Sequence, residues 1–245
     1  MEPEPSLPVY KRVLIKISGE ALMGNKSFGI DSATLESVCR QISEVKESGT
    51  EIGIVIGGGN IFRGLHAAER GMDRITADNM GMLATMMNAL AMMDTLEQIG
   101  VHTRVMSAVK LEAFAESYIR RRAVRHMEKG RIVIFAAGTG SPYFSTDTAA
   151  SLRAIEVNSE LLIKATNVAG VYSADPRTHE DAEFYPRLSY MDLLTRELQV
   201  MDSTAISLLK DSHIPVRVVD LNIPGNLKRV VLGEDIGTLI SNSVK

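Results

Sequence analysis

The sequence predicts an α/β fold in which a mainly parallel central sheet is covered by helices on both faces. Short runs rich in Val, Ile and Leu alternate along the chain with segments of helical periodicity. The runs are apolar almost throughout, which is typical of strands buried on both sides of a parallel sheet. No linker of low complexity and no repeat interrupts the pattern. We therefore expect one compact unit with at most two lobes.

The elements follow one another in a regular order. Apolar runs place strands at residues 12–17, 51–56, 101–106, 131–136, 160–164 and 215–220, with a short strand at 238–240. The periodic segments place helices at residues 32–48, 75–99, 115–129, 148–156, 190–198 and 203–211. Asp31 is a suitable N-cap for the first helix, and Gly49 and Gly100 mark helix ends.

Composition limits the classes of function. The chain has 245 residues, a formal net charge of −3, and 45% hydrophobic and 23% charged residues, which are ordinary values for a soluble globular protein. The charge argues against nucleic acid as the main partner, and no apolar stretch is long enough to span a bilayer. Cys39 is the single cysteine and the five histidines lack ligand spacing, so we expect no metal held by the protein itself. Residues 1–9 are acidic and proline-rich, which predicts a flexible tail rather than a signal peptide, and a cytoplasmic protein.

Two glycine-rich turns follow predicted strands. Strand 131–136 is followed by the turn at residues 138–146, and strand 51–56 runs into Gly57-Gly58-Gly59. A glycine turn before a helix directs backbone N–H groups at the positive end of the helix dipole, which suits a phosphate. Neither turn has the spacing of a dinucleotide-binding or Walker motif. Two such turns on one sheet suggest two phosphorylated groups held face to face, although the triplet alone is also a plain tight turn.

Three charged residues lie near these turns, and two of them, Lys16 and Asp147, have more than one possible role. Lys16 lies near the end of a buried strand, so it reaches the rim, pairs with Glu20, or meets a transferred phosphoryl group. Asp147 is either a helix N-cap or a group that orients Lys16 or assists Mg²⁺. Arg63 follows the glycine triplet closely, where a guanidinium group can bind phosphate.

Three further features of the sequence also have two possible interpretations each. Asp78 either caps the helix at 75–99 or accepts hydrogen bonds from two ribose hydroxyls. Residues 165–177 are either a plain polar loop or a surface for adenine and its ribose. The helix at 75–99 carries six methionines between Met80 and Met93 and is apolar around most of its circumference. It is therefore either central in the core or shared with another subunit.

The segments KISGEAL, IGGGNIFRG, ADNMGMLATMMNALAM, GTGSPYFSTDTAA, IKATNVAGVYSADP and RVVDLNIPGNLKRVVLGEDIGTLI occur in this order. With them the sequence resembles the bacterial uridylate kinases (UMP kinases) of the amino-acid-kinase superfamily, from about residue 10 to the C-terminus. The resemblance implies a three-layer αβα sandwich with one domain at residues 10–245, an acceptor-binding N-terminal lobe and an ATP-binding C-terminal lobe. It also implies a homohexamer and transfer of phosphate from ATP to UMP with Mg²⁺, giving UDP and ADP for pyrimidine nucleotide biosynthesis. Such enzymes are typically activated by GTP and inhibited by UTP.

The resemblance also assigns residues to sites, position by position. The ATP side matches Lys16, Ile17, Ser18, Gly19, Gly59, Arg63, Thr166, Asn167, Tyr172 and Asp175. The UMP side matches Gly58, Asp78, Thr139, Gly140, Ser141, Pro142, Tyr143, Phe144, Ser145 and Thr146. The segment associated with GTP activation is Gly24, Asn25, Lys26, Ser27, Phe28 and Gly29.

The catalytic residues implied are Lys16 for charge stabilisation in the transition state, Arg63 for phosphate binding, and Asp147 for organising Lys16 and the metal. Ala169 and Asn167 depart from the family pattern, so donor preference stays open. Two competing interpretations remain: a superfamily member that phosphorylates a carboxylate or carbamate, and a nucleotide-binding regulatory protein that has lost catalysis.

Overall fold

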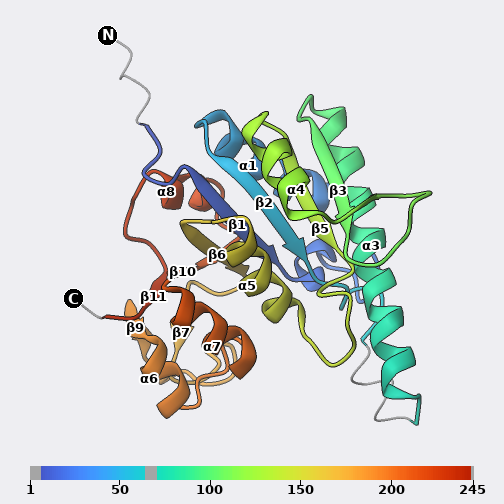
Figure 1. Cartoon of the computed structure of the whole chain (residues 1–245). Coiled ribbons are helices and arrows are strands. Elements are labelled where there is room, and N and C mark those ends of the chain that lie inside the picture. Colours follow the sequence, from blue (N-terminus) through green and yellow to red (C-terminus); the bar gives the residue numbers. More distant parts are fainter. Residues whose placement is uncertain (1–6, 64–70, 244–245) are drawn as a thin grey trace.

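The computed structural model describes residues 7–63 and 71–243. A central nine-stranded sheet runs through it in the order β4-β3-β5-β2-β1-β6-β10-β11-β9 (Figure 1). Its strands are β1 (Arg12–Ile17), β2 (Glu51–Ile56), β3 (Thr103–Ser107), β4 (Glu116–Ser117), β5 (Ile132–Ala136), β6 (Leu161–Thr166), β9 (Arg187–Ser189), β10 (Val216–Asp220) and β11 (Thr238–Ser241). Neighbouring strands are parallel except where β11 pairs antiparallel with β10. The predicted mainly parallel sheet is therefore confirmed.

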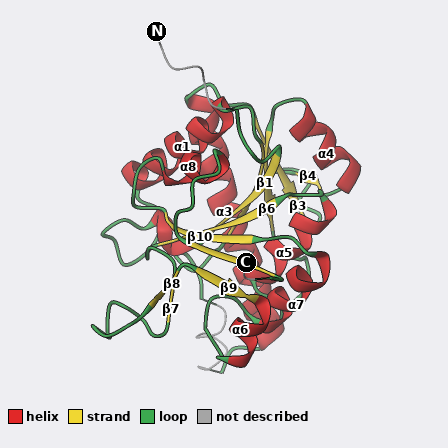
Figure 2. Ribbon diagram, turned by 90° about the vertical axis from the view of Figure 1, so that its left-hand side faces the viewer, coloured by secondary structure: helices red, strands yellow, loops and turns green. Residues whose placement is uncertain are grey.

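Helices cover both faces of this sheet. One layer holds α1 (Ser32–Glu47), α3 (Arg74–Gln98) and α8 (Asn226–Val231). The other holds α4 (Arg120–Glu128), α5 (Thr146–Glu156), α6 (Tyr190–Thr195) and α7 (Ser203–Ser212), as Figure 2 shows from the side. The result is the expected three-layer αβα sandwich, in which each face of the sheet has its own apolar core.

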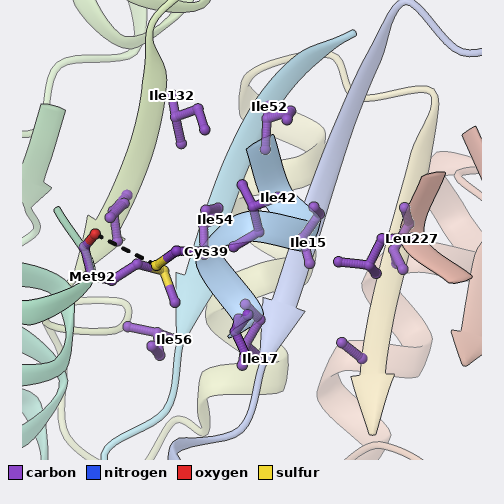
Figure 3. Close-up of a cluster of buried hydrophobic side chains, with 14 of the residues drawn as sticks. Ile15, Ile17, Cys39, Ile42, Ile52, Ile54, Ile56, Met92, Ile132 and Leu227 are labelled. Atoms are coloured by element: carbon purple, nitrogen blue, oxygen red, sulfur yellow. Dashed lines mark hydrogen bonds between the residues drawn. The ribbon is translucent and has the colours of Figure 1, made fainter. Parts of the chain in front are cut away.

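Side-chain alternation along the central strands assigns residues to these two cores. In β1, Val13, Ile15 and Ile17 pack on the α1 side, which Figure 3 shows around Ile15, Ile42 and Ile54. Leu14 packs on the opposite side, against α5 and its neighbours. Because successive side chains of a strand point to opposite faces, Lys16 also belongs to the α5 side.

Cys39 lies in the core on the α1 side, where its thiol approaches the backbone oxygen of Met92 at 3.9 Å (Figure 3). Burial raises the pKa of this thiol to about 12. Cys39 therefore packs as a small apolar side chain and is not a reactive group at neutral pH.

Several elements differ from the sequence-based expectation. The helix expected at 115–129 begins only at Arg120, because Glu116 and Ser117 pair with β3 as strand β4. A short 3₁₀ helix at Gly19–Leu22, helix α8, and the strands β7 (Val171–Tyr172), β8 (Phe184–Tyr185) and β9 were not expected. Strands of two or three residues leave no periodic signal in a sequence.

The methionine-rich helix α3 divides its side chains between core and surface. Met86 and Met92 are buried, whereas Leu83 and Met87 are 51% and 55% exposed. The helix is thus central on one side and apolar toward solvent on the other. No helix in the described part of the chain is long and apolar enough to cross a membrane.

The predicted tail falls partly outside the described residues, which begin at residue 7. Within it, the backbone N–H of Val9 donates to the carbonyl of Val231 in α8 at 2.8 Å. The end of the predicted tail is therefore tied to the domain.

Candidate active site

Two adjoining cavities open where the strands of the sheet end at their carboxyl termini, which is the usual ligand position in such folds. The larger, of about 740 Å³, lies by the ends of β1 and β6 and the hairpin β7–β8. The smaller, of about 460 Å³, lies between the glycine triplet after β2, the start of α3 and the loop after β5. Glu20 lines both cavities, so they meet at this side chain.

Lys16 and Lys164 line the larger cavity and form a charged cluster with Asp147, which lies outside the lining. Lys16 of β1 and Lys164 of β6 are directly paired in the register of adjacent strands. Their ammonium groups contact opposite oxygens of one carboxylate: Lys16 Nζ is 2.7 Å from Asp147 Oδ1, and Lys164 Nζ is 2.7 Å from Asp147 Oδ2. Lys164 also donates to the carbonyl of Val200 in the cavity wall.

The pKa values of Asp147 and Lys164 are both shifted within this cluster. Burial of Asp147 raises its pKa, but the ammonium groups of Lys16 and Lys164 lower it by more, so the pKa of Asp147 lies below its ordinary value. Burial lowers the pKa of Lys164, against the opposing pull of Asp147. The amino groups of Lys16 and Lys164 share one carboxylate, and both lysines line the larger cavity.

These contacts exclude two of the roles left open by the sequence. Lys16 pairs with Asp147 and not with Glu20, which instead pairs with Arg63. The N-cap of α5 is Ser145, whose hydroxyl accepts from the backbone N–H groups of Asp147 and Thr148 at 3.0 Å. Asp147 is therefore free of a capping role.

Close backbone contact explains the glycines between the cavities. A β-carbon on Gly19 would lie 2.4 Å from Asn60 Oδ1 and 2.9 Å from the carbonyl oxygen of Gly57. A β-carbon on Gly58 would lie 2.8 Å from the β-carbon of Ala84 in α3. The turns after β1 and β2 thus pack directly on each other and on α3. The side-chain amides of Asn60 and Asn88 donate hydrogen bonds to each other and so connect the turn after β2 to α3.

The loop after β5 is held in an unusual backbone conformation. Ala137 and Tyr143 have φ angles of 61° and 70°, in the left-handed region that non-glycine residues seldom adopt. The N–H of Ala137 donates to Thr85 Oγ1 at 2.8 Å, and the N–H of Tyr143 donates to Asp78 Oδ2 at 2.8 Å. Both acceptors come from α3, so this helix shapes the loop.

Asp78 is not the cap of α3, because that position belongs to Asp73, which accepts from the N–H of Thr76 at 2.8 Å. Asp78 instead lines the smaller cavity. At the other end of the loop, the Asp202 carboxylate accepts from the hydroxyls of Ser145 and Thr148 and caps α7, which joins the starts of two helices.

The residues that the resemblance assigns to sites fall into three groups. The larger cavity is lined by Lys16, Ser18, Thr166, Asn167, Tyr172 and Asp175. The smaller cavity is lined by Gly58, Gly59, Arg63, Asp78, Thr139, Ser141, Tyr143, Phe144, Ser145 and Thr146. Outside both linings are Ile17, Gly19, Gly140, Pro142, Asp147 and the segment Gly24–Gly29. Gly59 and Arg63, matched to the ATP side, thus lie on the smaller cavity at its border with Glu20.

The segment at residues 24–29 is nevertheless connected to the site. The N–H of Gly29 donates to the carbonyl of Asn60 at 2.8 Å, and the Asn60 amide donates back to the carbonyl of Gly29 at 3.0 Å. Asn60 directly follows Gly59, which lines the smaller cavity, so one residue separates Gly29 from that lining.

Sequence reasoning did not single out Lys164, Arg74 or Asp202. Lys164 carried the same signal as Lys16, an isolated lysine near the end of a buried strand. That the two lysines lie side by side depends on the strand order, which the sequence does not give directly.

Comparison with known proteins decides the family. The sequence matches the amino acid kinase family over residues 11–220. The chain belongs to this family. It is similar to the UMP kinase of Bacillus anthracis, with 43% identity and a TM-score of 0.92 over 96% of this chain and 97% of that one. It is also similar to the UMP kinase of Ureaplasma parvum, with 38% identity and a TM-score of 0.88 over 94% of this chain and 98% of that one.

A more distant structure, the uridylate kinase of Archaeoglobus fulgidus, is 28% identical with a TM-score of 0.71 and covers 94% of this chain and 99% of its own. The resemblance to bacterial uridylate kinases is therefore confirmed. This member of the amino acid kinase family is a phosphotransferase, and its two cavities are the candidate sites for donor and acceptor.

Proposed function

We propose that this kinase transfers the terminal phosphoryl group of ATP to the phosphate of UMP, giving UDP and ADP. The observation that carries the proposal is the meeting of the two cavities at Glu20, beside the cluster of Lys16, Asp147 and Lys164. The larger cavity is the proposed ATP site and the smaller one the proposed UMP site. The likeness to UMP kinases over nearly the whole chain supports this choice of acceptor.

In this proposal, catalysis consists of positioning and neutralising charge, which is the main requirement of phosphoryl transfer. Lys16 stabilises the negative charge that develops on the transferred group, and Asp147 fixes its ammonium group in place. When the substrates bind, Arg63 releases Glu20 and forms an ion pair with a phosphate group instead. The attacking oxygen belongs to an already ionised phosphate of UMP, so no side chain has to remove a proton.

Mg²⁺ would enter with ATP. Both carboxylate oxygens of Asp147 already contact ammonium groups, and no group of three or more His, Cys, Asp or Glu side chains suited to a metal gathers within residues 7–63 and 71–243. The phosphate oxygens of the nucleotide and water would therefore hold the ion, a common arrangement for Mg²⁺. The metal would neutralise phosphate charge, while Asp147 contributes by orienting Lys16.

Asp78 is the proposed acceptor for the ribose hydroxyls of UMP. We expect Asp78→Asn to raise the KM for UMP by roughly 10- to 100-fold, because a lost hydrogen bond to a charged group costs about 1.5–3 kcal/mol. The KM for ATP should stay close to the wild-type value, since Asp78 lies on the smaller cavity only. Titration calorimetry with UMP checks the result. Unchanged affinity in a folded variant would remove the ribose contact from the account.

The remaining features extend the proposal to regulation and assembly. We propose that residues 24–29 take part in activation by GTP, which the two hydrogen bonds between Gly29 and Asn60 support, and that UTP inhibits the enzyme. We also propose a cytoplasmic role in pyrimidine nucleotide biosynthesis. The exposed apolar side of α3, with Leu83 and Met87, is the proposed contact between subunits of a homohexamer.

Met87→Glu should dissociate that assembly, because it places a charge in the proposed apolar contact. Met86, by contrast, is a core residue, so its replacement would report on folding instead. Met191→Glu is the matched control, since Met191 is 52% exposed but lies on α6. Light scattering at micromolar concentration measures the outcome. A wild-type species near 26.7 kDa would refute the assembly.

The acceptor itself is tested by a coupled assay of ADP release with UMP, CMP, AMP, GMP, aspartate and carbamate. UMP should support by far the highest kcat/KM. Preference for aspartate or carbamate would favour a carboxylate or carbamate kinase, and no turnover with any acceptor would favour a regulatory protein on the same fold.

A further inference from the structure

Arg74 stands at a position where helix stability does not favour it. It is the first residue of α3, and the first turn contains no acidic residue. A helix N-terminus carries partial positive charge, which disfavours a cation there. The order of an arginine four residues before an aspartate is also the less favourable one for an ion pair along a helix. We therefore attribute the presence of an arginine at this position to the contacts that its side chain makes.

Arg74, Asp78 and Tyr143 form a closed set of contacts, here called the Arg74 clasp. Arg74 Nε donates to Asp78 Oδ2 at 2.8 Å, and the backbone N–H of Tyr143 donates to the same oxygen at 2.8 Å. The guanidinium carbon of Arg74 lies 5.2 Å from the centroid of the Tyr143 ring, within the range of a cation–π contact. All three residues line the smaller cavity.

The Arg74 clasp restrains Tyr143 in a strained backbone conformation. Tyr143 has a φ of 70°, which is unfavourable for a side chain with a β-carbon. The residue is 64% exposed, so packing into the core does not keep it in place. Its ring contact with Arg74 and its backbone bond to Asp78 tie it to α3 from two sides.

The clasp also orients Asp78 for a ligand. Both Arg74 and Tyr143 donate to Oδ2, and neither takes Oδ1. Oδ1 therefore keeps its capacity to accept a hydroxyl from a ligand in the smaller cavity. A carboxylate that is fixed before the ligand arrives loses less conformational entropy on binding.

We propose that Arg74 is a positioning residue of the acceptor site, which acts through Asp78 and Tyr143 to preset the smaller cavity for a nucleoside monophosphate. This inference rests on the proposed function, because it requires that Asp78 meets the ribose. It assigns Arg74 to binding of the acceptor, and not to the transfer step or to the larger cavity.

The first test is Arg74→Met, which retains an unbranched aliphatic stem and removes the charged guanidinium group. The KM for UMP should rise about tenfold, as expected for a lost charge-assisted contact. The kcat and the KM for ATP should change by less than about twofold, because ground-state binding of one substrate is affected. Arg40→Met is the matched control. Arg40 on α1 forms an ion pair with Glu36 at 2.6 Å, also at a spacing of four residues, and neither residue lines either cavity. This control should leave all three constants unchanged.

The second test distinguishes positioning from direct contact with the substrate. Adding Arg74→Met to the double variant Asp78→Asn, Tyr143→Ala should raise the KM for UMP little further, because the paths through Asp78 and through the Tyr143 ring are then both lost. Fully additive effects would mean that Arg74 binds UMP itself and would overturn the proposal. An unchanged KM in Arg74→Met, or a loss confined to kcat, would also overturn it.

Calorimetric titration of UMP without ATP repeats both tests independently of turnover. It also distinguishes a failure of the proposed function from a failure of the proposed role of Arg74. If the wild type binds UMP but does not phosphorylate it, the proposed function fails while the clasp is still tested by affinity. If the wild type does not bind UMP, both are wrong.

Discussion

We expect Lys16→Ala to lower kcat by about two to three orders of magnitude, the usual cost of removing one electrostatic contact to a transition state. UMP affinity should stay nearly intact, because Lys16 lines only the larger cavity. The variant should also fold, since Asp147 keeps Lys164 as its partner at 2.7 Å. Steady-state rates and calorimetry with UMP measure both effects.

The control for this variant is Lys129→Ala, which removes an exposed lysine at the end of α4. Its rates should equal those of the wild type. A Lys16→Ala enzyme with wild-type kcat would remove Lys16 from the mechanism. Equal losses of UMP affinity and rate would mean that the lysine contributes to acceptor binding instead.

The second large effect is expected from Asp147→Asn. The substitution leaves the paired ammonium groups of Lys16 and Lys164 facing each other without their shared anion. We expect the free energy of unfolding to fall by about 3 kcal/mol, since breaking a buried ion pair leaves an uncompensated charge. Adding Lys164→Met should recover part of this loss by removing one of the two cations. Urea unfolding of the three proteins measures the difference.

The pH dependence of this loss has a definite sign. The pKa of Asp147 is lower in the folded protein than its ordinary value. Its contribution to stability is therefore complete above the unfolded pKa of about 4. It is lost as the pH falls from there through the lowered folded pKa. The difference between wild type and Asp147→Asn should thus shrink at acid pH. A constant difference from pH 7 to pH 3 would contradict the charged contact.

Much of the fold follows from local sequence patterns. The long strands β1, β2, β5 and β6 were predicted because each is a nearly continuous apolar run between helices. The pattern failed where tertiary pairing decides. Glu116 and Ser117 continue a helical pattern in the sequence, but their pairing with β3 makes them a strand. The two-residue strands β7 and β8 exist only because they pair with each other.

The candidate site divides in the same way. The sequence indicated the glycine turns and Lys16, because glycines and an isolated lysine after buried strands are visible locally. It did not indicate that Lys164 shares Asp147 with Lys16, since this depends on β1 and β6 being neighbours. Nor did it indicate the Arg74 clasp, which joins the start of α3 to a loop 65 residues further along the chain. The catalytic and binding roles of these residues stay predictions.

The most direct test of the account is ³¹P NMR of the products formed by the wild-type protein with MgATP and UMP. We expect equal amounts of UDP and ADP, with the new phosphoanhydride bond on the phosphate of UMP. Formation of ADP with inorganic phosphate and no UDP, or no reaction at all, would contradict it.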